Sequence, residues 1–208
     1  LDDEVSLEVP PIDILSKKKI PCCFEALDKW LLEAIKEADY LIISLDTFIY
    51  GGIIPSRLHH LQYEEIISRS NIVRKIKKAN PDIKIYVNQL IMRCPGYSSA
   101  VEEPDYFDIC GLEICKHGIY FDKQQKGLLS SLEITQMNEN KSKIKDEYLF
   151  DFINRRKINA EVIIYNLRLL TDNVVDFFCI PQDDNAEYGF SSMDRVYIEQ
   201  YIAREKIR

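Results

Sequence analysis

Short apolar runs rich in β-branched residues alternate with longer stretches of helical period along this chain. The run at residues 40–46 is almost entirely apolar, which is typical of a strand whose sheet carries helices on both faces. This alternation predicts an α/β fold with an open, mostly parallel sheet and helices on both faces, in a Rossmann-like or flavodoxin-like three-layer arrangement. Further strands are predicted at residues 5–9, 83–92 and 175–181, and helices at 24–37, between a loop at 47–55 and residue 79, at 146–172 and at 192–206.

The length of 208 residues suits a single α/β domain spanning residues 1–208. Helical periodicity weakens at residues 94–145, so this stretch is predicted to be an irregular insertion or a flap over a site. Polar surface connections are expected within it at residues 124–127 and 138–142. The chain begins with leucine rather than methionine, and we therefore expect it to be part of a longer protein.

Composition and charge narrow the classes of partner. The chain carries 34 acidic and 27 basic residues, a net charge of −7, which argues against binding to nucleic acid or to an anionic membrane surface. Its longest apolar runs are far shorter than the roughly 20 residues of a membrane-spanning helix. Six cysteines without a CxxC pair favour reduced thiols in a cytoplasmic protein. Cys179 lies in an apolar run and is expected in the core.

Polar side chains follow the predicted strands at their carboxyl ends, where ligands bind in open α/β sheets. Asp46 follows one strand, Arg93 the next, and Asp183 with Asp184 the last. Two adjacent carboxylates repel one another, which suits proton transfer or the binding of a cation. Neither is needed as a helix cap, because Ser191 can begin the final helix. We therefore interpret Asp183, Asp184 and Asp46 as catalytic, and as the ligands if a divalent metal binds.

Each of these residues also has a structural interpretation. Asp46 could fix its own loop, and Arg93 could pair with a neighbouring carboxylate or clamp a ligand. Arg156 and Asn159 interrupt the apolar face of a predicted helix. Such a pair either joins the helix to loop carbonyls or faces a polar cavity. The acidic stretch at residues 102–106 is either a solvated loop or the source of a further carboxylate.

Several enzyme classes have no support from motifs. The chain contains no HExxH, GxSxG, GxGxxG or GxxxxGK[ST] pattern, so no nucleotide cofactor is expected. His59 and His60 are adjacent, and side chains about 100° apart on a helix do not form the i, i+4 pair that chelates zinc.

Five phrases of the sequence resemble a bacterial family, domain of unknown function family 4127. They are SLDTFIYGGIIPSR at residues 44–57, LIMRCP at 90–95, EEPDY at 102–106, RRKIN at 155–159 and PQDDNAEYG at 181–189. Proteins of that family are usually much longer, so the resemblance implies an N-terminal portion whose partner is the missing C-terminal portion. It also implies that one site contains Asp46, Arg57, Arg93, Asn159, Asp183 and Asp184.

Two places depart from the family pattern. An opening Leu-Asp-x-Arg-Pro phrase is represented here by leucine and aspartate alone, and a Pro-Gly-Asp phrase is replaced by Pro-Cys-Cys at residues 21–23. The first strand and the loop at residues 21–23 are therefore atypical of the family.

These observations lead to a hypothesis of a hydrolase acting on a small polar or sugar-like substrate. Asp183 and Asp184 would serve as general acid and base, Asp46 as a further carboxylate, and Arg93 with Arg156 as a clamp. The alternatives are a non-catalytic ligand-binding or regulatory module of a longer protein, and a purely structural network of ion pairs. The expected ligand-binding residues are Tyr50, Arg57, Arg93, Glu103, Arg156, Asn159, Gln182 and Tyr188.

Overall fold

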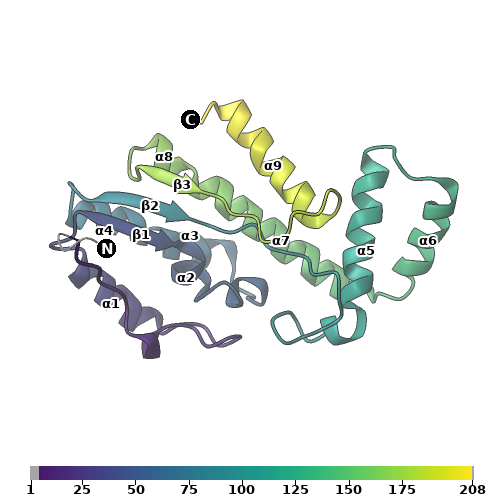
Figure 1. Cartoon of the computed structure of the whole chain (residues 1–208), viewed down its shortest axis with the longest axis horizontal. Helices are drawn as coiled ribbons and strands as arrows, with labels where there is room; N and C mark the ends of the chain where they lie inside the picture. Colours follow the sequence, from purple (N-terminus) through teal and green to yellow (C-terminus); the bar gives the residue numbers. More distant parts are fainter. Residues whose placement is uncertain (1–4, 208) are drawn as a thin grey trace.

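The computed structural model describes residues 5–207, and within them three parallel strands form one open sheet (Figure 1). The strands are β1 (Tyr40–Ser44), β2 (Lys84–Asn88) and β3 (Phe177–Cys179), in the spatial order β1-β2-β3. Helices connect each strand to the next, as parallel pairing requires. The α/β class and the open parallel sheet are therefore confirmed.

The predicted helices at residues 24–37, 146–172 and 192–206 are present with shifted ends. The helices are α1 (Phe24–Ala34), α2 (Leu45–Tyr50), α3 (Tyr63–Ser70), α4 (Ile72–Ala79), α5 (Phe107–Gln125), α6 (Ser131–Lys141), α7 (Asp146–Asn166), α8 (Arg168–Thr171) and α9 (Phe190–Glu205), with 3-10 turns η1 (Ile12–Ile14) and η2 (Pro55–Arg57). None of the helices in residues 5–207 is both long and apolar enough to span a membrane.

One face of the sheet builds the main core. Ile43, Ile85 and Val87 are nearly inaccessible and pack against apolar residues of α1, α3, α4 and α7. Full burial of such side chains contributes about 1.5–3 kcal/mol each. Figure 1 shows α3, α4 and α7 behind the sheet, in agreement with this cluster.

The opposite face of the sheet carries exposed apolar and aromatic side chains. Ile42 is 81% exposed and Phe177 54%, and the Tyr86 ring lies 6.5 Å from that of Tyr40 and 6.4 Å from that of Phe177. Of the helix layers expected on both faces of the sheet, the structure therefore has the one on a single face. Cys179 also lies on this face and is exposed, so its expected place in the core is wrong.

The strand predicted at residues 5–9 does not form. Within residues 5–207 the segment has no ladder partner, and Val5, Leu7 and Val9 are exposed. An alternating pattern makes a strand only when a neighbouring strand accepts its backbone hydrogen bonds.

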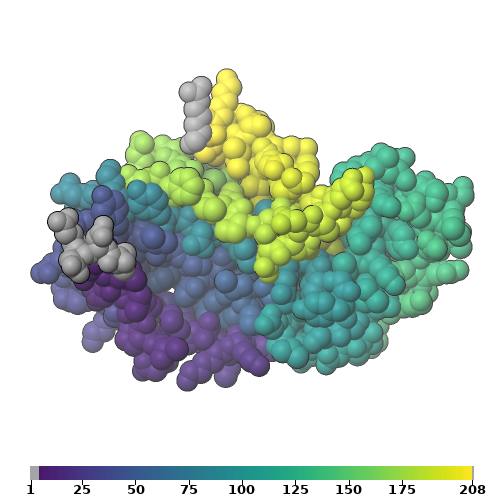
Figure 2. All heavy atoms as spheres, viewed as in Figure 1, coloured from purple at the N-terminus to yellow at the C-terminus, as the bar shows by residue number. Residues whose placement is uncertain are grey.

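The stretch predicted to be irregular at residues 94–145 contains two helices, α5 and α6. Figure 2 shows their teal atoms at one end of the molecule, beyond the sheet. The polar residues 138–142 mostly continue α6, whose start carries a capping box between Ser130 and Glu133. The apolar period is weak because α5 buries two glycines and contains a kink at Cys110.

The loop predicted at residues 47–55 begins as a helix instead. α2 follows β1 directly and ends at Gly51, whose φ of 90° only glycine adopts easily. A Cβ there would lie 2.5 Å from that of Pro21. This tight turn directs the chain into η2, which carries Arg57.

Candidate functional site

The carboxyl ends of the strands bring distant segments together. Asp46 lies in the first turn of α2, immediately after β1. Beyond β2 and β3, Ile91 and Gln182 still form a parallel bridge, so the segments carrying Arg93 and Asp183 run side by side. Arg57 reaches the same place from η2.

An ion-pair cluster occupies this edge, and we call it the Arg57–Arg93 cluster: Arg57, Arg93, Glu102, Glu103 and Asp183. Oε1 of Glu103 accepts hydrogen bonds from Arg57 Nη1 at 3.2 Å and Arg93 Nε at 2.9 Å. Arg93 Nη2 donates to Glu102 at 2.8 Å, and Arg57 Nη2 donates to Asp183 at 3.2 Å. Three carboxylates thus surround two guanidinium groups.

The cluster has a buried base and an open rim. The side chains of Arg57 and Glu103 are 4% and 1% exposed, whereas those of Glu102 and Asp183 are 42% and 40% exposed. Burial raises the pKa of Glu103, while the charge of Arg57 and the hydrogen bond from Arg93 lower it. The Nε atom of Arg57 and Oε2 of Glu103 are buried without a hydrogen-bond partner among the described residues.

Asp46 lies beneath the cluster and is 2% exposed. Its Oδ2 accepts the backbone N–H of Leu90 at 2.8 Å, which ties the β1–α2 junction to the end of β2. Burial raises its pKa to about 7. Tyr50 on the same helix is also buried; burial raises its pKa, and its hydroxyl has no partner among the described residues.

The raised pKa of Asp46 predicts a pH-dependent stability. Between about pH 4 and about pH 7 the unfolded chain releases this proton while the folded chain keeps it, so stability falls as pH rises. Asp46→Asn stays neutral, and its amide oxygen can still accept the Leu90 N–H. Urea unfolding across this range should show wild type losing about 3–4 kcal/mol more than the variant.

If wild type and Asp46→Asn lost the same free energy of unfolding across this pH range, Asp46 would not be a buried carboxyl with a raised pKa. The comparison also removes the contribution of His59, which is the same in both proteins. Burial lowers the pKa of His59 to about 4, so its contribution to stability rises with pH instead of falling.

Asp184 organises the loop before α9. It accepts hydrogen bonds from the Cys94 N–H at 3.1 Å, the Ser191 hydroxyl at 2.9 Å and the Ala186 N–H at 3.0 Å. Gln182 donates to the backbone oxygen of Asp184. α9 begins at Phe190 after Gly189, so Ser191 is not its cap as predicted; it bonds Asp184 instead.

Arg156 and Asn159 are buried on α7 and join it to loops. Arg156 donates to the carbonyl oxygens of Met92 at 2.7 Å and Arg93 at 2.9 Å, and to Asp194 at 2.6 Å. Asn159 donates to the Ser56 carbonyl at 2.9 Å. Of the two interpretations of this pair, a link between the helix and loop carbonyls or a face toward a polar cavity, the first therefore describes both residues. Neither the Arg156 guanidinium nor the Asn159 amide lies on the open rim of the Arg57–Arg93 cluster.

Tyr188 lies apart from the Arg57–Arg93 cluster. Its ring lies 4.9 Å from the ammonium of Lys126 and 5.5 Å from that of Lys123. With Asp184 it lines a cavity of about 20 Å³, room for about one water molecule.

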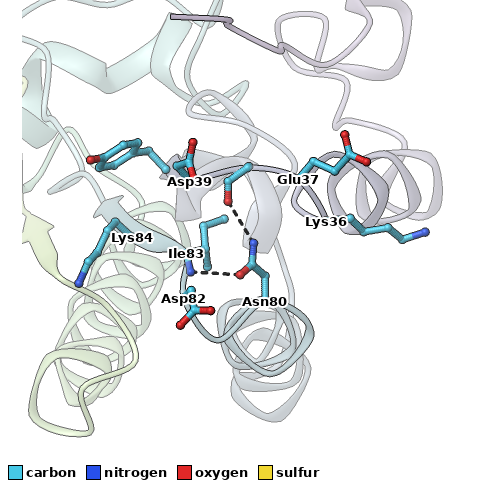
Figure 3. A pocket seen from close by; sticks show the side chains of 9 residues that line it. Lys36, Glu37, Asp39, Asn80, Asp82, Ile83 and Lys84 are labelled. Carbon is cyan, nitrogen blue, oxygen red and sulfur yellow. Dashed lines mark hydrogen bonds between the residues drawn. The ribbon is translucent and has the colours of Figure 1, made fainter.

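A hollow lies at the other edge of the sheet. It measures about 500 Å³ and is lined at the amino ends of β1 and β2 by Tyr40 and Lys84, among others (Figure 3). The Asn80 side chain donates to the carbonyl oxygen of Ala38. It also accepts from the backbone N–H of Ile83, as Figure 3 shows, so its amide is already paired. None of the predicted site residues lines this hollow.

The structure adds two residues to the rim, Glu102 and Tyr97. In the sequence, Glu102 stands out only as part of an acidic stretch. Tyr97, whose hydroxyl accepts a hydrogen bond from Arg93 at 3.3 Å, carries no sequence signal beyond its place after the strand. No three His, Cys, Asp or Glu side chains of residues 5–207 are placed to hold a metal ion together.

Comparison with known proteins identifies the family. No curated protein and no solved structure matches the chain. The model of a family described as protein of unknown function, DUF4127, matches residues 2–208, nearly the whole chain. The chain therefore belongs to the DUF4127 family.

Proposed function

We propose that the Arg57–Arg93 cluster binds a small, neutral, hydroxyl-rich ligand such as a sugar. The observation that carries this proposal is the open rim: Glu102 and Asp183 flank the partly exposed Arg93 above a buried Arg57–Glu103 pair. Carboxylates accept hydrogen bonds from ligand hydroxyls, and a guanidinium donates to ligand oxygens in a fixed planar geometry.

The buried pair preorganises the rim. Glu103 holds both guanidinium groups through one oxygen, so Arg93 loses little further rotamer freedom when a ligand binds. Tyr97 is 49% exposed beside Arg93, and its ring offers an apolar face to a sugar ring. An excess of one negative charge in the cluster disfavours anionic ligands.

Hydrolysis of a sugar-like substrate is the second candidate. Glu102 and Asp183 both contact the Arg57 guanidinium, at 3.5 and 3.2 Å. Two carboxyl groups held on one guanidinium are near enough to act on a single glycosidic bond. Asp184 and Asp46 are less suited to catalysis, because hydrogen bonds hold the first and burial isolates the second.

A reducing bacterial cytoplasm is the proposed compartment. The support for it is the family resemblance and the six cysteines, each a free thiol in the described residues.

Calorimetric titration of a panel of neutral monosaccharides, disaccharides and polyols tests the binding proposal. Wild type should bind at least one member saturably, and Asp183→Asn should bind it at least about tenfold more weakly, as expected for loss of a charged hydrogen bond. Asp105→Asn is the matched control: its side chain is fully exposed and contacts only Lys19 among the described residues.

Two results would contradict the proposal: no binding of any panel member, or equal affinity of wild type and Asp183→Asn. The hydrolase candidate is tested on aryl glycosides of the sugars that bind. It requires release of the aryl group by wild type and loss of that release in both Glu102→Gln and Asp183→Asn.

A further inference from the structure

Two cysteine side chains meet where the loop after β2 approaches α5. Cys94 follows Arg93 and is 7% exposed, whereas Cys115 lies on α5 and is partly exposed. The Sγ atom of Cys115 lies 3.6 Å from the carbonyl oxygen of Cys94. Both residues line the cavity of about 20 Å³ that also contacts Asp184. Two thiols that share so small a cavity are placed to react with one another.

The two thiols differ in ionisation. A hydrogen bond between them lowers the pKa of Cys115 and raises that of Cys94. Burial raises both pKa values, and the Arg156 guanidinium lowers both. Cys115 is therefore the sulfur that ionises more readily, and its partial exposure lets a reagent reach it.

The other cysteines lack such a partner in the described residues. Cys22 and Cys23 are adjacent across a trans peptide, so their Cα atoms lie about 3.8 Å apart, closer than the roughly 4.4–6.8 Å of disulfides. Cys110 donates its thiol to the Tyr106 carbonyl at 3.4 Å. Cys179 is exposed on β3.

We propose that Cys94 and Cys115 form a reversible disulfide by exchange with low-molecular-weight disulfides of the glutathione class. The Cys115 thiolate attacks one sulfur of the reagent, which forms a mixed disulfide and releases one thiol. Cys94 then gives up its proton and attacks Cys115 Sγ, which releases the second thiol. The two cysteines lose two electrons and two protons in total, and the reagent disulfide gains them as two thiols.

The cross-link joins the loop that carries Arg93 to α5. Asp184 already accepts a hydrogen bond from the backbone N–H of Cys94, so oxidation adds a second tie, to α5, at the same residue. Closing the chain between residues 94 and 115 also restricts the unfolded state, and we expect a higher thermal midpoint for the oxidised protein. This thiol pair does not depend on the proposed ligand.

The test uses the whole chain with the exposed Cys23 and Cys179 replaced by serine, so that neither competes for the reagent. After incubation with oxidised glutathione, intact mass should fall by two hydrogen atoms. Peptide mapping without reducing agent should find one cross-linked pair, Cys94 with Cys115. Dithiothreitol should reverse both the mass change and the rise in thermal midpoint.

Single variants in the same background identify the order of attack. Cys94→Ser should stop at the mixed disulfide and keep one glutathione on Cys115, and Cys94→Ala gives the same readout if the serine variant does not fold. Cys110→Ser is the matched control and should cross-link like its parent. Absence of the cross-link in the folded parent, a cross-link through another cysteine, or an unmodified Cys115 in the Cys94 variants overturns the proposal.

Discussion

Replacing Glu103 by glutamine is expected to lower the free energy of unfolding by about 3–5 kcal/mol. Glu103 is fully buried and is the shared acceptor of two guanidinium groups. The amide keeps the shape but removes the charge, so the buried Arg57 loses its principal counter-ion at the base of the cluster. Urea denaturation at neutral pH measures the difference directly.

Glu102→Gln is the matched control for this prediction. Glu102 is the preceding residue and contacts the same two guanidinium groups, but its side chain is 42% exposed. Solvent screens such a contact, so the loss should stay below about 1 kcal/mol. If the two variants lost the same free energy of unfolding, the burial of Glu103 would not increase its contribution to stability over that of Glu102.

Replacing Arg156 by methionine is also expected to cost about 3–5 kcal/mol. The methionine fills most of the volume but leaves the Met92 and Arg93 carbonyls without this donor and Asp194 without its cation. Burial raises the pKa of Asp194, and Arg156 lowers it. The variant should therefore also take up a proton at Asp194, which carbon-detected NMR of the carboxyl group can follow.

Lys157→Met provides the comparison for Arg156→Met. Lys157 is the next residue on α7, its side chain is 71% exposed, and it approaches Glu161 at 3.9 Å. The change should alter stability by less than about 0.5 kcal/mol. If Arg156→Met unfolds at the same urea concentration as Lys157→Met, Arg156 does not join α7 to the loop after β2.

The sequence predicted the sheet well because its strands are buried on at least one face. The runs at residues 40–46, 83–92 and 175–181 contain β1, β2 and β3, although each strand is shorter than its run. Apolar content does not reveal where the backbone leaves the ladder, and residues 45–46 already belong to α2. The same limit explains residues 5–9, where the alternation is present but no partner strand is.

The candidate site was predicted in part. The rule that ligands lie at strand carboxyl ends led to Arg93 and Asp183, and the family resemblance added Arg57. The structure places these three side chains next to one another. The sequence alone could not show that Arg156 faces carbonyl oxygens or that Tyr188 lies over two lysines, because both depend on tertiary contacts with α9 and α5. Glu102 and Glu103 read alike in sequence, and only burial separates them.

We propose that the Arg57–Arg93 cluster, rather than the hollow of about 500 Å³ at the other edge of the sheet, is the ligand site. NMR of the arginine Nε–Hε groups and of the backbone amides tests it most directly, during titration with the tightest binder of the sugar panel. We expect the Arg93 signal to shift saturably while that of Arg204, whose side chain is 71% exposed on α9, stays in place. An unchanged Arg93 signal, with shifts confined to Tyr40, Lys84 and their neighbours around the hollow, would contradict it.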